Sequence, residues 1–126
     1  MADQPVVCIS KRFRFDSAHR LPAVASEHSC SRLHGHTYTL EVEVKGRVDP
    51  EKGWLMDYDA LKRAVKPLVA ELDHHTLNEA EGLTNTTAEE LAVWFWNRLK
   101  PRLPMLSRVS VSETPTTRCD YYGEME

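Results

Sequence analysis

The sequence predicts an α+β fold in which an antiparallel sheet carries helices on one face. Early segments alternate apolar and polar residues with the period of a strand, and later segments repeat apolar residues with the period of a helix. The expected order is strand, strand, strand, helix, helix, strand, which is typical of α+β domains. The 126 residues are an ordinary length for one domain, so residues 1–126 are predicted to form a single unit.

Strand patterns dominate the first part of the chain. Residues 6–15 and 36–48 alternate, and the second segment does so as a half-buried antiparallel strand does. The apolar positions on one face are Val7, Ile9, Phe13 and Phe15 in the first segment, and Leu40, Val42 and Val44 in the second. Residues 16–33 are predicted to be a long loop of the functional kind. The short apolar run 54–56, after a turn, is predicted to be the returning strand.

Two helices and a last strand are expected next. The first helix begins at Asp57 as N-cap, and Pro67 is predicted to kink it or to end its first part, although the apolar period continues. The second begins near Thr87, which has capping-box spacing to Glu90. The buried stripes contain Leu61, Val65, Leu68, Val69 and Leu72 in the first helix, and Leu91, Phe95 and Leu99 in the second. The last strand is predicted over residues 108–113.

Charge and hydropathy exclude several classes of function. Sixteen Lys and Arg against nineteen Asp and Glu leave a net charge of -3, so no basic excess indicates nucleic acid as a partner. No apolar run approaches the roughly 20 residues that cross a bilayer. The N-terminal residues lack the charged start and long apolar stretch of a signal peptide. We therefore expect a cytoplasmic protein without a membrane partner.

The motif His34-Gly35-His36 indicates a metal site. Residues two apart in a strand point to the same side, and zinc favours neutral imidazole nitrogen. Catalytic zinc commonly has three protein ligands and one open position, and His19, which follows the first strand, is the best third ligand. The alternative is that the histidines are satisfied by ordinary hydrogen bonds, because such a short motif also arises by chance.

Further residues near this motif could supply acid–base chemistry. Cys30 lies four residues before His34, and a thiol near a metal has a lowered pKa and can act as base or nucleophile. Cys30 could instead be a fourth ligand that closes a structural site. Asp73 precedes His74, and such an Asp can set the tautomer of a proton-transferring imidazole. His75 competes for that role, and a plain polar loop is the alternative.

Glu113 lies on the same predicted face of the last strand as Val109 and Val111, which is expected to be the core face. A carboxylate that points into an apolar region needs a partner. A cyclic guanidine, with two adjacent N–H donors, would provide paired hydrogen bonds. Alternatively, the strand ends at Ser112 and Glu113 is exposed.

These segments together resemble the 6-pyruvoyl-tetrahydropterin synthase superfamily over nearly the whole chain. The matching pieces are residues 15–19 (FDSAH), 30–36 (CSRLHGH), 53–58 (GWLMDY), 72–78 (LDHHTLN) and 112–114 (SET). The short gap between Cys30 and His34 is similar to that of the 6-carboxytetrahydropterin synthases of the queuosine pathway, because the animal pyruvoyl enzymes carry a longer insertion there. Thr86 departs from the family pattern, in which Pro is frequent.

The resemblance implies the tunnelling fold, a four-stranded antiparallel sheet with two helices on one face. It also implies that subunits join into a barrel, commonly as a homohexamer of two trimers with active sites between subunits. The implied roles are Zn²⁺ ligands for His19, His34 and His36, a proton-abstracting thiolate for Cys30, a proton relay that faces the zinc across a subunit boundary for Asp73 and His74, and pterin binding for Glu113 and Thr87.

The implied reaction converts 7,8-dihydroneopterin triphosphate to 6-carboxy-5,6,7,8-tetrahydropterin, acetaldehyde and triphosphate. The 6-pyruvoyl reaction on the same substrate, a zinc- or pterin-binding protein without turnover, and a structural zinc site with Cys30 as ligand are the alternatives. For the triphosphate, Arg14, Arg20 and Arg32 are candidates, and the sequence does not choose among them.

Overall fold

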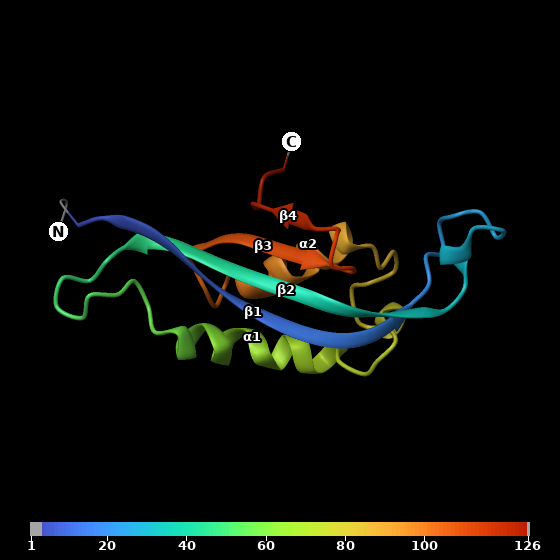
Figure 1. Ribbon diagram of the computed structural model, residues 1–126, viewed down its shortest axis with the longest axis horizontal. Coiled ribbons are helices and arrows are strands. Elements are labelled where there is room, and N and C mark those ends of the chain that lie inside the picture. Colours follow the sequence, from blue (N-terminus) through green and yellow to red (C-terminus); the bar gives the residue numbers. More distant parts are fainter. Residues whose placement is uncertain (1–3, 126) are drawn as a thin grey trace.

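The computed structural model describes residues 4–125, which form a four-stranded sheet and two α-helices. In chain order the elements are β1 (Val6–His19), β2 (His34–Arg47), α1 (Tyr58–Leu72), α2 (Ala88–Leu99), β3 (Leu106–Ser112) and β4 (Cys119–Tyr121), with short 3₁₀ turns at Ser29–Ser31 and Leu77–Glu79. The sheet is antiparallel with the strand order β1-β2-β3-β4 (Figure 1). The predicted α+β class is confirmed.

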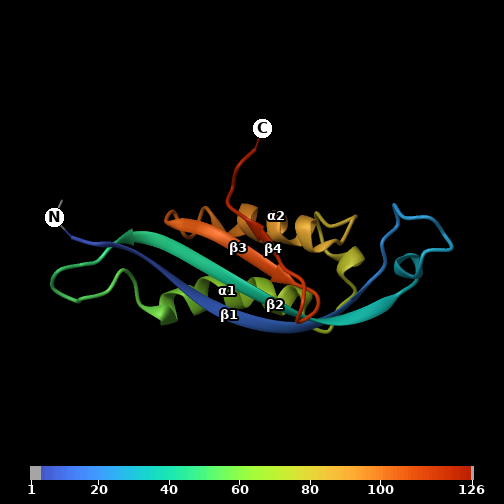
Figure 2. The ribbon, with the colours of Figure 1, turned by 45° about the horizontal axis from the view of Figure 1, so that its top comes forward.

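Both helices pack on the same side of the sheet, α1 along β1 and α2 behind β3 and β4 (Figures 1 and 2). The core forms between them from the apolar face of each strand and the apolar stripe of each helix. Its fully buried members include Tyr38, Leu40, Val42, Val44, Leu61, Val65, Leu72, Leu91, Phe95, Leu99, Val109 and Val111. No helix in the described part of the chain is long and apolar enough to cross a membrane.

The two long strands extend past the rest of the sheet. β1 pairs with β2 over its whole length, from Val6 opposite Arg47 to His19 opposite His34. β3 pairs with β2 only where β2 runs from Thr39 to Val44. Beyond that point the β1–β2 pair continues alone and ends in the projecting loop 20–33 (Figure 1).

This extension corrects two predicted boundaries. The loop predicted from residue 16 begins only at residue 20, because Ser17 and His19 are buried and continue the strand alternation. The second strand begins at His34 rather than at residue 36. His34 and His36 therefore both lie within a regular strand, on the same face.

The predicted third strand at 54–56 is wrong. These residues lie in turns and bends between β2 and α1. Leu55 instead packs over Gly46, where an added Cβ would lie 2.7 Å from Leu55 Cδ1. The fourth strand is β4, which the sequence analysis missed because three residues with a central Asp120 carry no strand pattern.

The helices begin where their caps predict. The Asp57 side chain accepts a hydrogen bond from the Asp59 N–H, and Thr87 Oγ1 accepts one from the Glu90 N–H at 3.2 Å. Helix α1 runs through Pro67 to Leu72 without ending, contrary to one of the two predicted outcomes. The buried apolar stripe on both sides of Pro67 stabilises the continuous helix.

Candidate active site

The three predicted metal ligands converge at the end of the β1–β2 pair. His19 lies opposite His34 in the register, and His36 is two residues further along the same face. The ring centroids are 4.5 Å apart for His19 and His34, 5.1 Å for His19 and His36, and 5.0 Å for His34 and His36. One ring nitrogen from each histidine lies within 4.8 Å of those of the other two.

Backbone carbonyls fix the orientation of two of these rings. His19 Nδ1 donates to the Thr86 carbonyl at 2.8 Å, and His34 Nδ1 donates to the Arg32 carbonyl at 2.7 Å. Because a carbonyl only accepts, each Nδ1 carries the proton, and in the neutral ring Nε2 holds a lone pair. This is the outer hydrogen bond that metal-ligating histidines usually make. Sequence reasoning missed Thr86 in this role, since a backbone carbonyl has no residue signature.

The donor set fits zinc. His19 is 1% exposed, and burial lowers the pKa of its imidazole, which keeps the ring neutral at pH 7. The Nε2 atoms of His19 and His34 face each other at 3.0 Å, an arrangement in which two lone pairs need a shared cation. Three neutral imidazoles suit a zinc ion with an open fourth position.

Tyr38 forms the floor of the histidine group. Its ring stacks on Phe15 at 5.1 Å and meets His19 and His36 edge-on at 5.9 and 5.6 Å. Within residues 4–125 its buried hydroxyl has no hydrogen-bond partner, and burial raises its pKa. The phenol is therefore neutral at the floor of the site.

Cys30 lies in the projecting loop, in the short turn just before His34. Its backbone N–H donates to His28 Nδ1 at 3.0 Å, and its carbonyl accepts from the Leu21 N–H at 2.7 Å. The group of ligand atoms within 4.8 Å contains the three histidines and does not contain the Cys30 thiol. The loop thus carries a half-buried thiol that lies outside the three-histidine group.

Asp73 and His74 lie along the outer edge of β1, where the segment that follows α1 runs beside the strand. His74 Nδ1 is 3.0 Å from Asp73 Oδ1, which also accepts the Asp16 N–H at 2.9 Å. That backbone hydrogen bond lowers the pKa of Asp73. His74 has φ +60°, a left-handed conformation that is uncommon outside glycine and marks a constrained residue.

The Asp73–His74 pair therefore forms outside the group of the three histidines, although His74 and His36 line the same cavity of about 530 Å³. The ligand atoms of Asp16, Asp73 and His74 make a separate group within 4.8 Å. Asp16 is exposed, whereas Ser17 and His19 point to the buried face, because successive strand residues alternate.

Glu113 follows the end of β3 and points toward the metal group. Its Oε2 lies 3.9 Å from His36 Nε2, and its side chain is 27% exposed. The strand ends at Ser112, as one of the two sequence alternatives required, yet Glu113 is only part-exposed. Glu113 separates two cavities, one of about 460 Å³ that it shares with His36 and one of about 410 Å³ that it shares with Ala88 and Glu89.

Thr87 lies at the start of α2, directly before Ala88 and Glu89, which line the cavity of about 410 Å³. Its hydroxyl oxygen already caps the helix by accepting from the Glu90 N–H. A hydroxyl can accept and donate at once, so its proton remains available to a ligand. Its predicted substrate contact stays a prediction.

Known proteins share this sequence and fold. A family model described as 6-pyruvoyl tetrahydropterin synthase matches residues 8–124. A 6-carboxy-5,6,7,8-tetrahydropterin synthase from Synechocystis is 38% identical over 121 residues, covering 91% of this chain and 92% of that protein. A dihydroneopterin monophosphate aldolase from Pyrococcus furiosus is 40% identical over 105 residues, covering 81% and 85%. The structure of 6-pyruvoyl tetrahydropterin synthase from Caenorhabditis elegans superposes with a TM-score of 0.88 at 28% identity, covering 96% and 98%. The chain thus belongs to the 6-pyruvoyl tetrahydropterin synthase family, and its three converging histidines lie in that family's fold.

Proposed function

We propose that this protein is a zinc-dependent carbon–carbon lyase that converts 7,8-dihydroneopterin triphosphate and water to 6-carboxy-5,6,7,8-tetrahydropterin, acetaldehyde and triphosphate. It would act in the cytoplasm, in queuosine biosynthesis. The observation that carries the proposal is the three-histidine group with the Glu113 carboxylate 3.9 Å from His36. The relative named 6-carboxy-5,6,7,8-tetrahydropterin synthase, 38% identical to this chain, supports the choice of product.

The histidine group would hold the metal, and each neighbouring side chain has a separate task. Bound zinc supplies Lewis-acid polarisation of oxygen on the substrate side chain. Glu113 would bind the 2-amino and ring N–H donors of the pterin with paired hydrogen bonds, and Thr87 would assist from the start of α2. These contacts would anchor the ring so that the substrate side chain lies over the metal, and this orientation would lower the barrier to reaction.

Proton transfer is assigned to the thiol and the imidazole. Cys30, as thiolate, would remove a proton from the substrate side chain, and His74 would return one with its ring oriented by Asp73. The position of the Asp73–His74 pair at the outer edge of β1, outside the three-histidine group, supports a role in a neighbouring subunit's site. The proposed assembly is a homohexamer, a dimer of trimers, in which two chains complete each site.

A second candidate is the 6-pyruvoyl reaction on the same substrate. The likeness to the Caenorhabditis elegans 6-pyruvoyl tetrahydropterin synthase, with a TM-score of 0.88, favours it. The same metal and thiol could perform either reaction, so the two candidates differ in product rather than in site. A protein that binds zinc or pterin without turnover would need neither Cys30 nor the Asp73–His74 pair.

Product identification tests the proposal. The zinc-loaded protein is incubated with 7,8-dihydroneopterin triphosphate, and the products are analysed by mass spectrometry. The 6-carboxy pterin together with acetaldehyde is the expected result. A 6-pyruvoyl product would show that the protein catalyses the second candidate reaction. Absence of turnover with zinc bound would overturn both candidate reactions.

A further inference from the structure

A groove leads from the metal group to the face of the sheet that carries no helices. Because β3 ends at Ser112, opposite Thr39, the edge of β2 beyond that point is open. The cavity of about 460 Å³ at this edge is lined by His36 and Glu113 on one side and by Arg14 on the other. It therefore connects the metal group with the uncovered face of the sheet.

A second cavity of about 340 Å³ continues the first one. The two share Thr39, Thr114 and Pro115 as walls. The second is lined by Arg12 and Arg118, by Glu41, and by hydroxyl side chains of the β3–β4 loop, Thr114, Thr116 and Thr117. Guanidinium and hydroxyl groups together are the donors that recognise phosphate oxygens.

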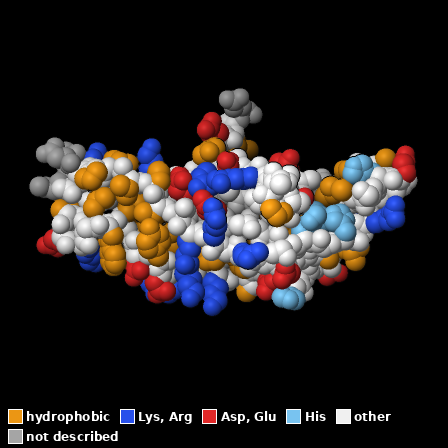
Figure 3. All heavy atoms as spheres, in the orientation of Figure 1, with side chains coloured by type: hydrophobic (Ala, Val, Ile, Leu, Met, Phe, Trp, Pro, Cys, Tyr) orange, Lys and Arg blue, Asp and Glu red, His pale blue; other side chains and the backbone are white. Residues whose placement is uncertain are grey.

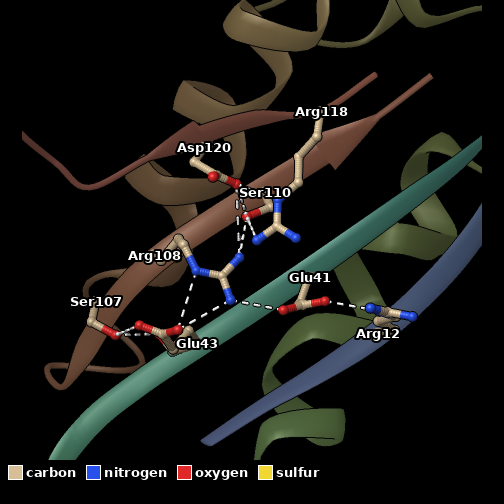
Figure 4. Close-up of polar contacts among 8 residues, drawn as sticks. All are labelled: Arg12, Glu41, Glu43, Ser107, Arg108, Ser110, Arg118 and Asp120. Atoms are coloured by element: carbon tan, nitrogen blue, oxygen red, sulfur yellow. Dashed lines mark hydrogen bonds and ion pairs between the residues drawn. The ribbon is translucent and has the colours of Figure 1, made fainter. Parts of the chain in front are cut away.

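Fixed ion pairs hold both arginines of the second cavity in place. Arg12 Nε donates to Glu41 at 2.8 Å, and Arg118 Nε donates to Asp120 at 2.6 Å (Figure 4). In the described hydrogen bonds Arg12 uses only Nε, which leaves the other guanidinium nitrogens for a ligand. The side chain of Arg12 is 74% exposed and that of Arg118 is 45% exposed, so both guanidinium groups can also contact a ligand in the cavity.

The buried guanidinium of Arg108 also pairs with the carboxylates that lie between Arg12 and Arg118. Its guanidinium donates to Glu41 at 2.7 Å and to Glu43 at 3.1 Å, and it lies 3.8 Å from Asp120 (Figure 4). The side chain of Arg108 is only 9% exposed, so its charge is used by these carboxylates and is not available to a ligand. The three carboxylates and three guanidinium groups of this cluster balance in charge, so attraction for an anion comes from the unused N–H donors of Arg12 and from Arg14.

Arg14 completes the path between the metal and the second cavity. It is exposed, two residues from Arg12 on the same face of β1, and it takes part in no ion pair within residues 4–125. Figure 3 shows basic side chains gathered over the middle of this face, with histidines beside them. Cations thus follow the groove in sequence from the metal group outward.

We propose that this groove binds an oligophosphate, and that it holds the triphosphate tail of the substrate with Arg14 nearest the metal and Arg12 and Arg118 further out. The proposal rests on the proposed function for the identity of the tail. Triphosphate binding alone does not depend on turnover. Of the three arginines that the sequence left open, the structure favours Arg14, because only Arg14 lines a cavity with both His36 and Glu113.

The test measures binding of inorganic triphosphate to the zinc-loaded protein by calorimetry. Arg14→Ala is the main variant because Arg14 has no ion pair to lose, and Arg118→Ala is the second. Arg63→Ala is the matched control, since Arg63 is an exposed arginine paired with Asp59 on α1, away from the groove. Zinc content and circular dichroism verify that each variant is folded.

We expect each groove variant to weaken triphosphate binding about tenfold or more and the control to bind normally, as for loss of a charged hydrogen bond. The same variants should raise KM for 7,8-dihydroneopterin triphosphate. Unchanged triphosphate affinity in Arg14→Ala and Arg118→Ala would overturn the groove while leaving the proposed function in place. Weakened triphosphate binding in a protein without turnover would support the groove and overturn the proposed function.

Discussion

At His19, burial and a backbone hydrogen bond act in opposite directions on one imidazole. Burial lowers the pKa, the hydrogen bond to the Thr86 carbonyl raises it, and the burial effect is the larger. The ring is therefore neutral at pH 7 with its proton on Nδ1 and a lone pair on Nε2, which is the form a metal ion binds. The His19 ring thus has the tautomer and the orientation of a metal ligand without a bound metal.

Replacement of one ligand should release the metal. We expect His34→Ala to lose stoichiometric zinc, because two imidazoles do not satisfy the tetrahedral preference of the ion. His75→Ala is the control, since His75 is exposed and lies outside the histidine group. Elemental analysis of the purified proteins measures the change, and full zinc content in His34→Ala would contradict the ligand assignment.

Cys30 should affect the rate and not the metal. We expect Cys30→Ala to lower kcat by about 10²–10⁴-fold, the usual contribution of a general base, while zinc content stays unchanged. Cys8→Ala, at an exposed cysteine of β1, should keep the full rate. Loss of zinc together with activity in Cys30→Ala would instead favour the structural-site alternative.

Tyr38 permits a stability prediction of the opposite sign from most core substitutions. Its hydroxyl is buried without a partner in the described chain, so Tyr38→Phe removes an unsatisfied polar group and keeps the ring contacts. The free energy of unfolding of the metal-free protein should stay equal or rise by about 1 kcal/mol. Urea denaturation measures it, and a loss above that size would indicate an unseen partner of the hydroxyl.

Among the elements, the sequence predicts those with a long periodic pattern of apolar residues. It does not predict short strands, whose formation depends on pairing with another strand. The helices and the β1–β2 pair have enough periodic residues to be recognised. β4 has three residues and exists because β3 supplies its partner, whereas Trp54, Leu55 and Met56 have the composition of a strand but no neighbouring strand. Short strands depend on contacts distant in sequence, which a local pattern does not contain.

The charged network on the uncovered face of the sheet should make stability depend on pH. Hydrogen bonds from Arg12 and then Arg108 lower the pKa of Glu41 from 4.5 to about 2. A depressed carboxyl pKa stabilises the fold above the unfolded value, and this stabilisation is lost as the pH falls from about 4.5 toward 2. Glu41→Gln should therefore lower the free energy of unfolding by about 1–3 kcal/mol at pH 7 and by much less near pH 3.

Urea denaturation at the two pH values gives the comparison. Glu71→Gln, at an exposed position of α1, is the control and should show a small difference that is the same at both pH values. The prediction fails if the destabilisation by Glu41→Gln is equal at pH 7 and pH 3, because the carboxylate would then contribute no linked proton.

Across the whole molecule, the candidate site divides into two separate groups of side chains near the same end of β1. The histidines and Glu113 form one group, and Asp73 and His74 lie beside Asp16 at the outer edge of β1. Motifs local in sequence identified both groups, but a single-chain pattern carries no information on which copy of the chain each group serves. The edge strands β1 and β4 leave the sheet open to further subunits.

The separation of the two groups predicts complementation between inactive subunits. Cys30→Ala removes the thiol beside the metal, and His74→Ala removes the imidazole of the relay, so each variant alone should be inactive. If each site combines two chains, co-assembled variants form some sites with both groups intact, about one quarter of the total for random mixing in a symmetric oligomer. Co-expression with two affinity tags isolates mixed assemblies, and light scattering should give a mass near six times the 14.4 kDa chain. Activity in the mixture would place Asp73 and His74 at the neighbour's metal, whereas a mixture as inactive as its parts would place them at their own.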